Sequence, residues 1–158
     1  MIFLNTIVNL YSIQEGEIQR FLSLFYGNNN LFNIDNDLKW EKNYDGKSLI
    51  KADVSDNGMP VLAYSAAGSS VKGNATEIEL LNRLGKSTAS TIIDAAADAV
   101  CVNNEQIAVA CGKKAVILDS SLKTVREVNA DTGIKKMAFF GDGKHLFVIG
   151  SSGGMIVG

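Results

Sequence analysis

A strand, a tight polar turn and a second strand recur three times between Ser48 and Gly158. Each pair of apolar segments is joined by a short run rich in Gly, Asn and Asp, residues that favour turns. The pairs are Ile50–Val54 with Pro60–Ala66, Ala99–Val102 with Gln106–Cys111, and Ile134–Phe140 with His145–Gly150. Recurrence at about 40 residues is typical of a propeller blade or a similar β-repeat, whose units need neighbours to bury their apolar faces. The pattern predicts a mainly β fold of antiparallel strand repeats.

Counted as blades, the repeats occupy residues 48–90, 91–131 and 132–158. The first two units are nearly complete, and the third stops in its third strand. Propellers close with about four to eight blades, so three partial blades predict an incomplete β-propeller-like array. Such an array leaves strand edges and apolar faces uncovered, which favours a protein partner or self-association through the open strand edges.

Two different compositions divide the chain near Asp45-Gly46. Residues 1–47 hold eight of the twelve aromatic residues but only three of the 15 glycines, whereas residues 48–158 are rich in Ala, Val, Gly and Ser. A shift of this kind indicates a boundary between segments. We therefore expect one segment over residues 1–47 and a propeller-like repeat region over residues 48–158. The shift also supports the hypothesis that the chain is a fragment or a fusion.

The segment before the boundary predicts a small β-α-β unit. Residues 2–9 are apolar and β-branched, as in a strand, and residues 37–44 alternate between polar and apolar positions. Between them, Ser12 and Glu15 match a capping box, and an apolar stripe predicts a helix over residues 13–26. The stripe would cover its own sheet or dock a partner; in an alternative fold, a single compact α+β domain, it covers the later strands. Its main residues are Ile18, Phe21, Leu22 and Phe25.

Four short motifs stand out in this segment: Met1–Thr6 (MIFLNT), Asn9–Tyr11 (NLY), Glu17–Leu22 (EIQRFL) and Lys39–Tyr44 (KWEKNY). Through them, residues 1–44 resemble the start of a family of small uncharacterised bacterial proteins found in clostridia and their relatives. The resemblance implies a further aliphatic strand and a carboxy-terminal helix, and it implies no known activity.

Further motifs mark the repeat region: Ala52–Gly58 (ADVSDNG), Ile107–Ala110 (IAVA), Ala115–Ser120 (AVILDS), and Ile134–Phe140 (IKKMAFF) with the turn Gly141–Lys144. On these residues, the region is similar to bacterial proteins of uncharacterised function with WD40-like or quinoprotein-like propeller repeats. The Trp-Asp dipeptide of WD40 blades is absent, so the resemblance implies the architecture alone.

Charge and hydropathy disfavour two classes of partner. The 15 basic and 17 acidic residues leave a net charge of −2, which offers no footprint for nucleic acid or an anionic membrane. The apolar run over residues 1–10 lacks a basic start, so it is not typical of a signal peptide. No stretch approaches the roughly 18 apolar residues of a spanning helix. We therefore expect a cytoplasmic protein without membrane insertion.

The two cysteines are expected to be free. If the turn is centred on Asn104-Glu105, Cys101 lies opposite Ala108 and Cys111 lies opposite Asp98. The two thiols are then three positions out of register, roughly 10 Å apart at about 3.3 Å per residue, which is too far for a disulfide. Free thiols are typical of a reducing compartment.

Two loops match binding motifs in part. Gly85-Lys86-Ser87-Thr88 fits the second half of a phosphate-binding P-loop, but Leu80 stands where the first glycine belongs. Gly46-Lys47-Ser48 fails in the same way. Residues 53–58 offer oxygen ligands and a glycine at calcium-loop spacing, but Tyr64 stands where a bidentate Glu is needed. Polar hairpin turns explain these residues better, so we predict no metal and no cofactor.

Catalytic groupings are weak as well. His145 is the only histidine, and nothing in the spacing of Cys111, Asp142 and His145 favours a thiol catalyst. The acidic residues Glu77, Glu79, Asp94 and Asp98 are more typical of solvated strand and loop positions than of a catalytic pair. Residues 88–98 fit helical and strand spacing alike, and we favour a short strand followed by a turn.

The sequence therefore predicts a mainly β protein without catalytic, cofactor-binding or metal-binding residues. The leading hypothesis is a non-enzymatic structural or protein-interaction module that uses rigid sheets as a platform. The competing hypothesis is a quinoprotein-like propeller enzyme or a ligand-binding protein that lacks its complete ring.

Overall fold

Residues 9–15, 18–25, 28–33, 38–43, 47–66 and 74–158 are described by a computed structural model, with side chains from Lys47 onward. Every regular element in these residues is a strand. The strands pair antiparallel in chain order and form four sheets, of which the last has three strands and the others four. No helix in the described part of the chain is long and apolar enough to cross a membrane.

The sheets follow one another along the chain. The first contains β1 (Asn9–Glu15), β2 (Ile18–Phe25), β3 (Asn28–Asn33) and β4 (Leu38–Asn43). The second contains β5 (Leu49–Val54), β6 (Pro60–Ser65), β7 (Thr76–Leu81) and β8 (Ser87–Ile93). The third contains β9 (Ala99–Val102), β10 (Gln106–Cys111), β11 (Lys114–Asp119) and β12 (Thr124–Asn129). The fourth contains β13 (Ile134–Phe139), β14 (Leu146–Gly150) and β15 (Gly154–Val157).

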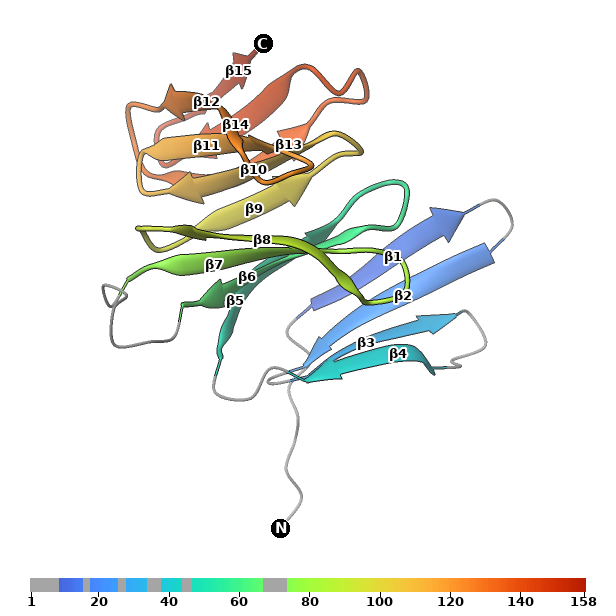
Figure 1. Ribbon diagram of the computed structural model, residues 1–158. Helices are drawn as coiled ribbons and strands as arrows, with labels where there is room; N and C mark the ends of the chain where they lie inside the picture. Colours follow the sequence, from blue (N-terminus) through green and yellow to red (C-terminus); the bar gives the residue numbers. More distant parts are fainter. Residues whose placement is uncertain (1–8, 16–17, 26–27, 34–37, 44–46, 67–73) are drawn as a thin grey trace.

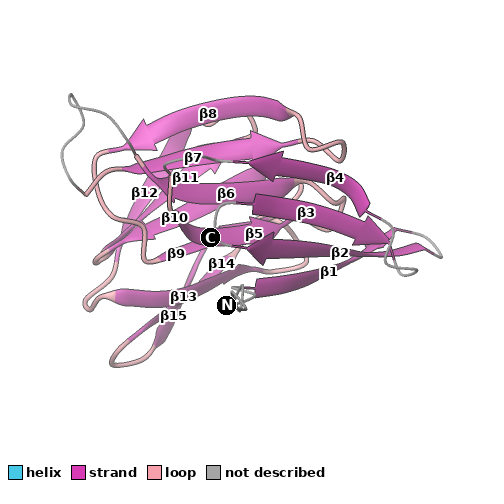
Figure 2. Cartoon of the chain, turned by 90° about the horizontal axis from the view of Figure 1, so that it is seen from below, coloured by secondary structure: helices cyan, strands magenta, loops and turns pink. Residues whose placement is uncertain are grey.

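The four sheets form an open arc. The first strand of each sheet lies innermost, and the contacts between sheets run from β1 to β5, from β5 to β9 and from β9 to β13. No comparable contact among the described residues joins β13–β15 to β1–β4. These two sheets lie at opposite ends of the arc in Figure 1, and Figure 2 shows the strands of the successive sheets from below.

Two apolar clusters hold the sheets together, one on each side of the third sheet. Ile107 and Val109 of β10 pack against the second sheet, and their neighbours Ala108 and Ala110 pack against the fourth. Because both faces are covered, β10 is a continuous apolar run without polar alternation. The second, third and fourth sheets are therefore stacked face to face.

The hairpin turns follow from their residues. Gly58 has φ +78°, a left-handed conformation that glycine adopts without strain, and Gly85 has φ +73°. Buried Ser55 accepts the Met59 N–H at 3.0 Å, which closes the first turn of the second sheet. Asn82 Oδ1 accepts the backbone N–H groups of Leu84 and Lys86 in the β7–β8 turn. The polar turns thus set the pairing of the strands they join.

The expected β-α-β unit is wrong for the described residues. The helix expected over residues 13–26 is replaced by the end of β1 and by β2, so the compact α+β alternative is wrong there too. A short apolar run fits helical and strand spacing alike, and pairing with neighbouring strands decides between them. The expected strand over residues 37–44 is confirmed as β4. The strand expected over residues 2–9 lies almost wholly outside the described residues.

The repeat region matches the sequence predictions closely. All three strand pairs are present within a residue or two of the expected bounds, and the last unit stops in its third strand. β8 confirms the strand expected within residues 88–98. Cys101 lies opposite Ala108 as expected, and both cysteines are free. Since β1–β4 form a further four-stranded sheet, the array contains one sheet more than the three counted.

Candidate interaction surface

The last sheet turns one face away from the rest of the arc. Residues paired across antiparallel strands point to the same side, so Ala138, Phe147 and Ile156 form one row across β13, β14 and β15. The alternate residues Leu146 and Val148 are buried against the third sheet. We call the opposite side the outward face. It consists of Ala138, Phe140, Phe147, Ile149 and Ile156, bordered by Lys136 and His145.

The outward face is apolar and open. Ile156 is 61% exposed, Phe140 42% and Ile149 36%. Phe147 meets Phe140 edge to face, with 6.4 Å between ring centroids. Its ring also lies over Gly154, because a Cβ added at Gly154 would approach it to 2.9 Å. Aromatic contacts of this kind order the face, so it is a formed surface that no described residue covers.

The third sheet shows what the same face looks like when it is covered. On its side toward the fourth sheet, Ala108, Ala110, Ala115 and Ile117 are all 0% exposed. Ala108 occupies the position that Phe147 holds in the fourth sheet, since each is paired with the next-to-last residue of the first strand of its sheet, Cys101 in β9 and Ala138 in β13. The outward face is therefore the equivalent of an interface between two sheets.

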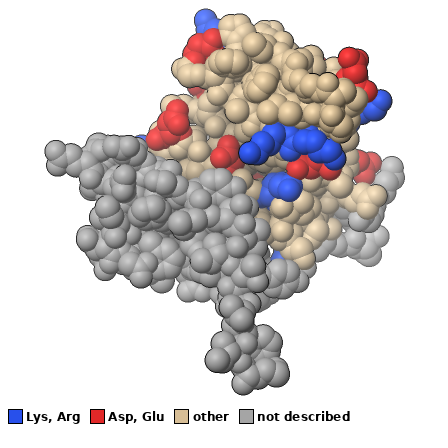
Figure 3. Space-filling model, turned by 180° about the vertical axis from the view of Figure 1, so that it is seen from behind, with Lys and Arg blue, Asp and Glu red and all other residues tan. Residues whose placement is uncertain are grey.

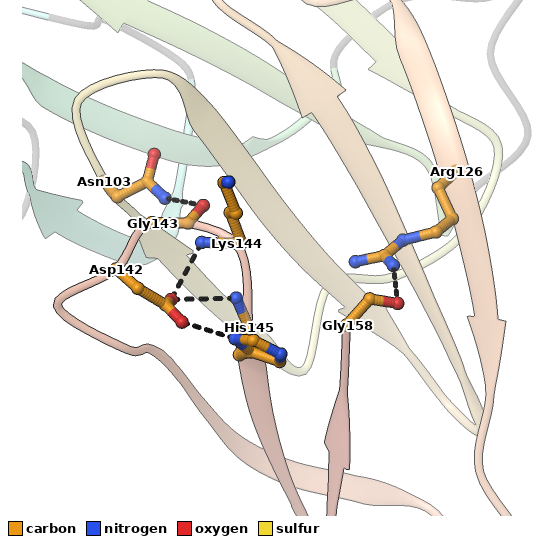
Figure 4. Close-up of polar contacts among 7 residues, drawn as sticks. All are labelled: Asn103, Arg126, Asp142, Gly143, Lys144, His145 and Gly158. Carbon is orange, nitrogen blue, oxygen red and sulfur yellow. Dashed lines mark hydrogen bonds and ion pairs between the residues drawn. The ribbon is translucent and has the colours of Figure 1, made fainter.

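Polar contacts fix the fourth sheet to the third (Figure 4). Asn103 Nδ2 donates to the Gly143 carbonyl oxygen at 3.1 Å, which joins the equivalent turns of the two sheets. Arg126 of β12 donates to the carbonyl oxygen of Gly158 at 2.6 Å and so holds the end of β15. The carboxylate of Asp142 accepts the N–H groups of Lys144 and His145 and contacts the His145 ring. These hydrogen bonds lower the pKa of Asp142 to about 2.

A hollow of about 320 Å³ opens along the inner strands β5, β9 and β13. Lys51, Lys135 and Lys136 line it together with Asp53 and Asp98. The side chains of these three lysines make no hydrogen bond or ion pair among the described residues. Figure 3 shows Lys and Arg side chains gathered beside acidic ones near the middle of the molecule seen from behind. With three lysines against two acidic residues, the hollow has a small excess of basic side chains, which can attract a small anion.

Asp53 and Cys101 lie deeper in the same hollow. Burial raises the pKa of Asp53, although its Oδ2 accepts the Val102 N–H at 2.8 Å and that bond opposes the rise. Burial, reinforced by the Asp53 charge, raises the pKa of the Cys101 thiol strongly. A buried thiol of this kind is unreactive at neutral pH.

The loops that matched binding motifs are structural turns. Residues 85–88 lie in the β7–β8 hairpin, whereas a P-loop leads from a strand into a helix. Residues 53–58 run from the end of β5 into the turn before β6. No group of acidic, histidine or cysteine side chains that could hold a metal ion occurs among the described residues. The turn at Gly46-Lys47-Ser48 is described only from Lys47 onward, and Lys47 pairs with Glu77 at 2.6 Å.

The other candidate groupings are not assembled. Asp142 and His145 are in contact. Cys111, however, ends β10 at the opposite end of the sheets, next to the pair formed by Ile134 and Gly150. Asp98 accepts the Gly112 N–H at 2.6 Å, and Glu77 is paired with Lys47. Glu79 is buried in β7 and has a partner. Side chains of the stripe Ile18, Phe21, Leu22 and Phe25 lie outside the described residues.

Comparisons with solved structures define the class of fold. Hsv2 of Kluyveromyces marxianus is similar over 96% of this chain, with a TM-score of 0.71 and 12% identity. BamB of Moraxella catarrhalis is similar over 93% (TM-score 0.66, 12% identity), and Sqt1 of Saccharomyces cerevisiae over 96% (TM-score 0.67, 11% identity). These are β-propeller proteins, so the chain has a propeller-like fold. It spans just under half of their lengths: 46% of Hsv2 and BamB and 45% of Sqt1.

Sequence comparisons add no narrower class. No family model and no curated protein matches the chain. The resemblance of residues 1–44 to a clostridial family is therefore unsupported. The resemblance to propeller proteins, by contrast, is supported, because the similar solved structures have the same architecture of stacked sheets.

Proposed function

We propose that this chain is a non-enzymatic protein-interaction module that binds another protein through the outward face of β13–β15. One observation carries the proposal: the face is apolar and exposed, whereas the equivalent face of the third sheet is fully buried. Clustered exposed apolar side chains bordered by polar residues are typical of protein-binding sites. The propeller-like fold supports this role, because its rigid stacked sheets keep the face in place without a partner.

Binding of one partner should depend on Ile156. We suggest immobilising the wild-type chain, Ile156→Asp and Val125→Asp, and comparing the proteins each retains from a cell extract. Val125 is the matched control, since it is 57% exposed but lies on β12, away from the outward face. A partner retained by the wild type and Val125→Asp, but lost by Ile156→Asp, is the expected result. Identical sets on all three would refute a role for this face.

The hollow with Lys51, Lys135 and Lys136 favours a second candidate, the binding of a small anionic ligand or cofactor. Thermal-shift screening with metals, nucleotides and quinone cofactors distinguishes the two functions. The interaction module predicts no shift with any of them. A reproducible shift that disappears in Lys51→Gln or Lys135→Gln would instead favour the ligand-binding alternative.

A further inference from the structure

We infer that β8 pairs with β8 of a second copy of this chain, antiparallel across a two-fold axis at Ser90, so that two four-stranded sheets join into one. The contact lies on the second sheet, away from the outward face, and goes beyond the proposed function. Three observations carry it: the open edge of β8, the lack of charge along this strand, and a sequence that is complementary to itself across Ser90.

The outer edge of β8 is open among the described residues. β8 is the last strand of the second sheet, and β7 is the only described strand that pairs with it. It runs along the upper rim of the molecule in Figure 2. Thr88, Ser90 and Ile92 are exposed, whereas Ala89 and Ile93 pack on the apolar cluster between the second and third sheets. An edge strand of this kind offers unpaired backbone N–H and C=O groups to a further strand.

β8 lacks the protection that the other outer strands carry. Natural edge strands avoid pairing through charged side chains, proline or short length. β12 contains Arg126 and Glu127, β4 contains two lysines and a glutamate, and β15 has only four residues. β8 has seven residues, STASTII, without charge or proline. It is therefore the outer strand best able to accept another strand.

The sequence around β8 selects a second copy as that strand. Antiparallel pairing centred on Ser90 places Ala89 opposite the partner's Thr91, so small side chains meet beside the axis. In the same register, Lys86 lies opposite the partner's Asp94 at both ends of the contact. Both side chains are exposed, and a carboxylate accepts several hydrogen bonds, so the contact that Asp94 makes within its own chain leaves room for Lys86. A strand of unrelated sequence would not supply both charge pairs.

A two-fold contact also limits the size of the assembly. Both copies use the same edge, so the pairing covers both edges and leaves none for a third copy. The register shift between β7 and β8 lies at the start of β8, and from Ala89 to Ile93 the pairing with β7 is regular. The strand is therefore regular beside the axis, and the expected species is a dimer.

Oxidative cross-linking tests the pairing directly. Ser90→Cys places two thiols opposite each other across the axis, close enough for a disulfide, so mild oxidation should give a covalent species of twice 16.9 kDa. Thr88→Cys is the matched control, because its two thiols would lie about 13 Å apart along the strands and should not join. Both variants retain Cys101 and Cys111, so these thiols cannot account for a difference. Equal cross-linking of the two variants, or none in Ser90→Cys, would refute the pairing.

Light scattering tests the contact without cross-linking. The mass of the wild type should approach twice 16.9 kDa as its concentration rises. Ser90→Lys should weaken association about tenfold, because two lysines then face each other across the axis. Val125→Lys is the control on the exposed side of β12 and should leave association unchanged. Lys86→Glu should also weaken it about tenfold, and adding Asp94→Lys should restore it by exchanging the charges.

Other outcomes overturn the inference in recognisable ways. A wild type that is monomeric at every concentration, or a dimer that Ser90→Lys leaves intact, would refute the contact. A double exchange that does not restore association would refute the register. If Ser90→Lys does not fold, Lys86→Glu at the exposed turn gives the same test. A dimer lost in Ile156→Asp but kept in Ser90→Lys would refute pairing through β8 while supporting the outward face as the binding surface.

Discussion

Single residues join the sheets of the arc, and Asp53 shows how. Its carboxylate reaches from β5 to the Val102 N–H of β9 and so links the second sheet to the third. Burial raises its pKa above the ordinary value of 3.8, with the Val102 hydrogen bond in opposition. The folded protein therefore takes up a proton on Asp53 at a higher pH than the unfolded chain does.

Asp53→Asn should make the protein less sensitive to pH. Because the pKa of Asp53 is raised on folding, its effect on stability is most favourable below about pH 3.8 and is lost as the pH rises through the folded value. Asn keeps an oxygen for the Val102 N–H but carries no charge. Urea unfolding at a series of pH values measures this difference. As the pH rises from 3.8 through the folded pKa of Asp53, the free energy of unfolding of Asp53→Asn should increase relative to that of the wild type. Asp53→Ala, which leaves the N–H unpaired, should be about 1–3 kcal/mol less stable than Asp53→Asn at every pH, because neither variant carries the carboxyl group.

Gly150 should not tolerate a side chain. A Cβ added there would overlap Thr132 Oγ1 and lie 3.4 Å from the Gly133 carbonyl oxygen. Gly150→Ala should therefore reduce the free energy of unfolding by about 1–3 kcal/mol. Gly141→Ala is the control, since its added Cβ meets nothing within 4 Å, and its effect should stay within about 0.5 kcal/mol. Equal stability of the two variants would contradict this packing.

At the level of the elements, local residue chemistry predicted the later strands and failed on the earliest. The strands of the repeat region are bounded by turns such as Asn57-Gly58, which have few alternatives to a hairpin. In residues 9–25, a glycine stands between Glu15 and Ile18, which are paired in the structure. This glycine indicates a hairpin turn, but the capping-box pattern in the same segment favours a helix. The apolar residues of β2 fit the spacing of a helix and that of a strand, and only the pairing of β2 with β1 and β3 shows that the segment is a strand.

The candidate site could not be predicted from sequence for a different reason. Phe147 and Ile149 stand in the run Leu146–Ile149, which is as apolar as the doubly covered run in β10. Sequence pattern reports that a strand has two apolar faces, but not that a neighbour is missing from one of them. The exposed edge was predicted in general terms from the blade count, and the residues that form the face emerge only from the register of β13, β14 and β15.

Arg126 should hold β15 in place. Its 2.6 Å hydrogen bond to the Gly158 carbonyl oxygen ties the end of the edge strand to β12. In Arg126→Ala, amide exchange in β15 should accelerate roughly tenfold, as expected for a charge-assisted bond of about 1.5 kcal/mol. Lys114→Ala removes only the exposed pair with Glu127 and should leave β15 unchanged. Unaltered exchange in Arg126→Ala would show that β14 alone retains the strand.

The whole molecule depends on the third sheet, because apolar clusters cover both of its sides. Ile107 lies in the cluster toward the second sheet, and Ile117 lies in the cluster toward the fourth. Both side chains are almost fully buried, at 2% and 0% exposure. Both apolar clusters therefore depend on the packing of side chains from this one sheet.

Truncation of either isoleucine should destabilise the arc as a unit. Ile107→Ala and Ile117→Ala should each lower the free energy of unfolding by about 2–5 kcal/mol, with a single transition seen by circular dichroism and by Trp40 fluorescence. Val125→Ala on the exposed side of β12 is the control and should change stability little. Separate transitions in the two probes would show that the first sheet unfolds independently of the rest.

The order of contacts along the arc also has a consequence for biosynthesis. Every strand pairs with its neighbour in sequence, and every sheet packs on the one made just before it. Because the contacts between the described sheets run between neighbours, this part of the chain can fold progressively from its amino-terminal end while the ribosome is still extending it, as repeat proteins do. The sheet β13–β15 follows the first three sheets in the sequence, so the outward face with Phe147 and Ile156 forms on sheets that have already been synthesised.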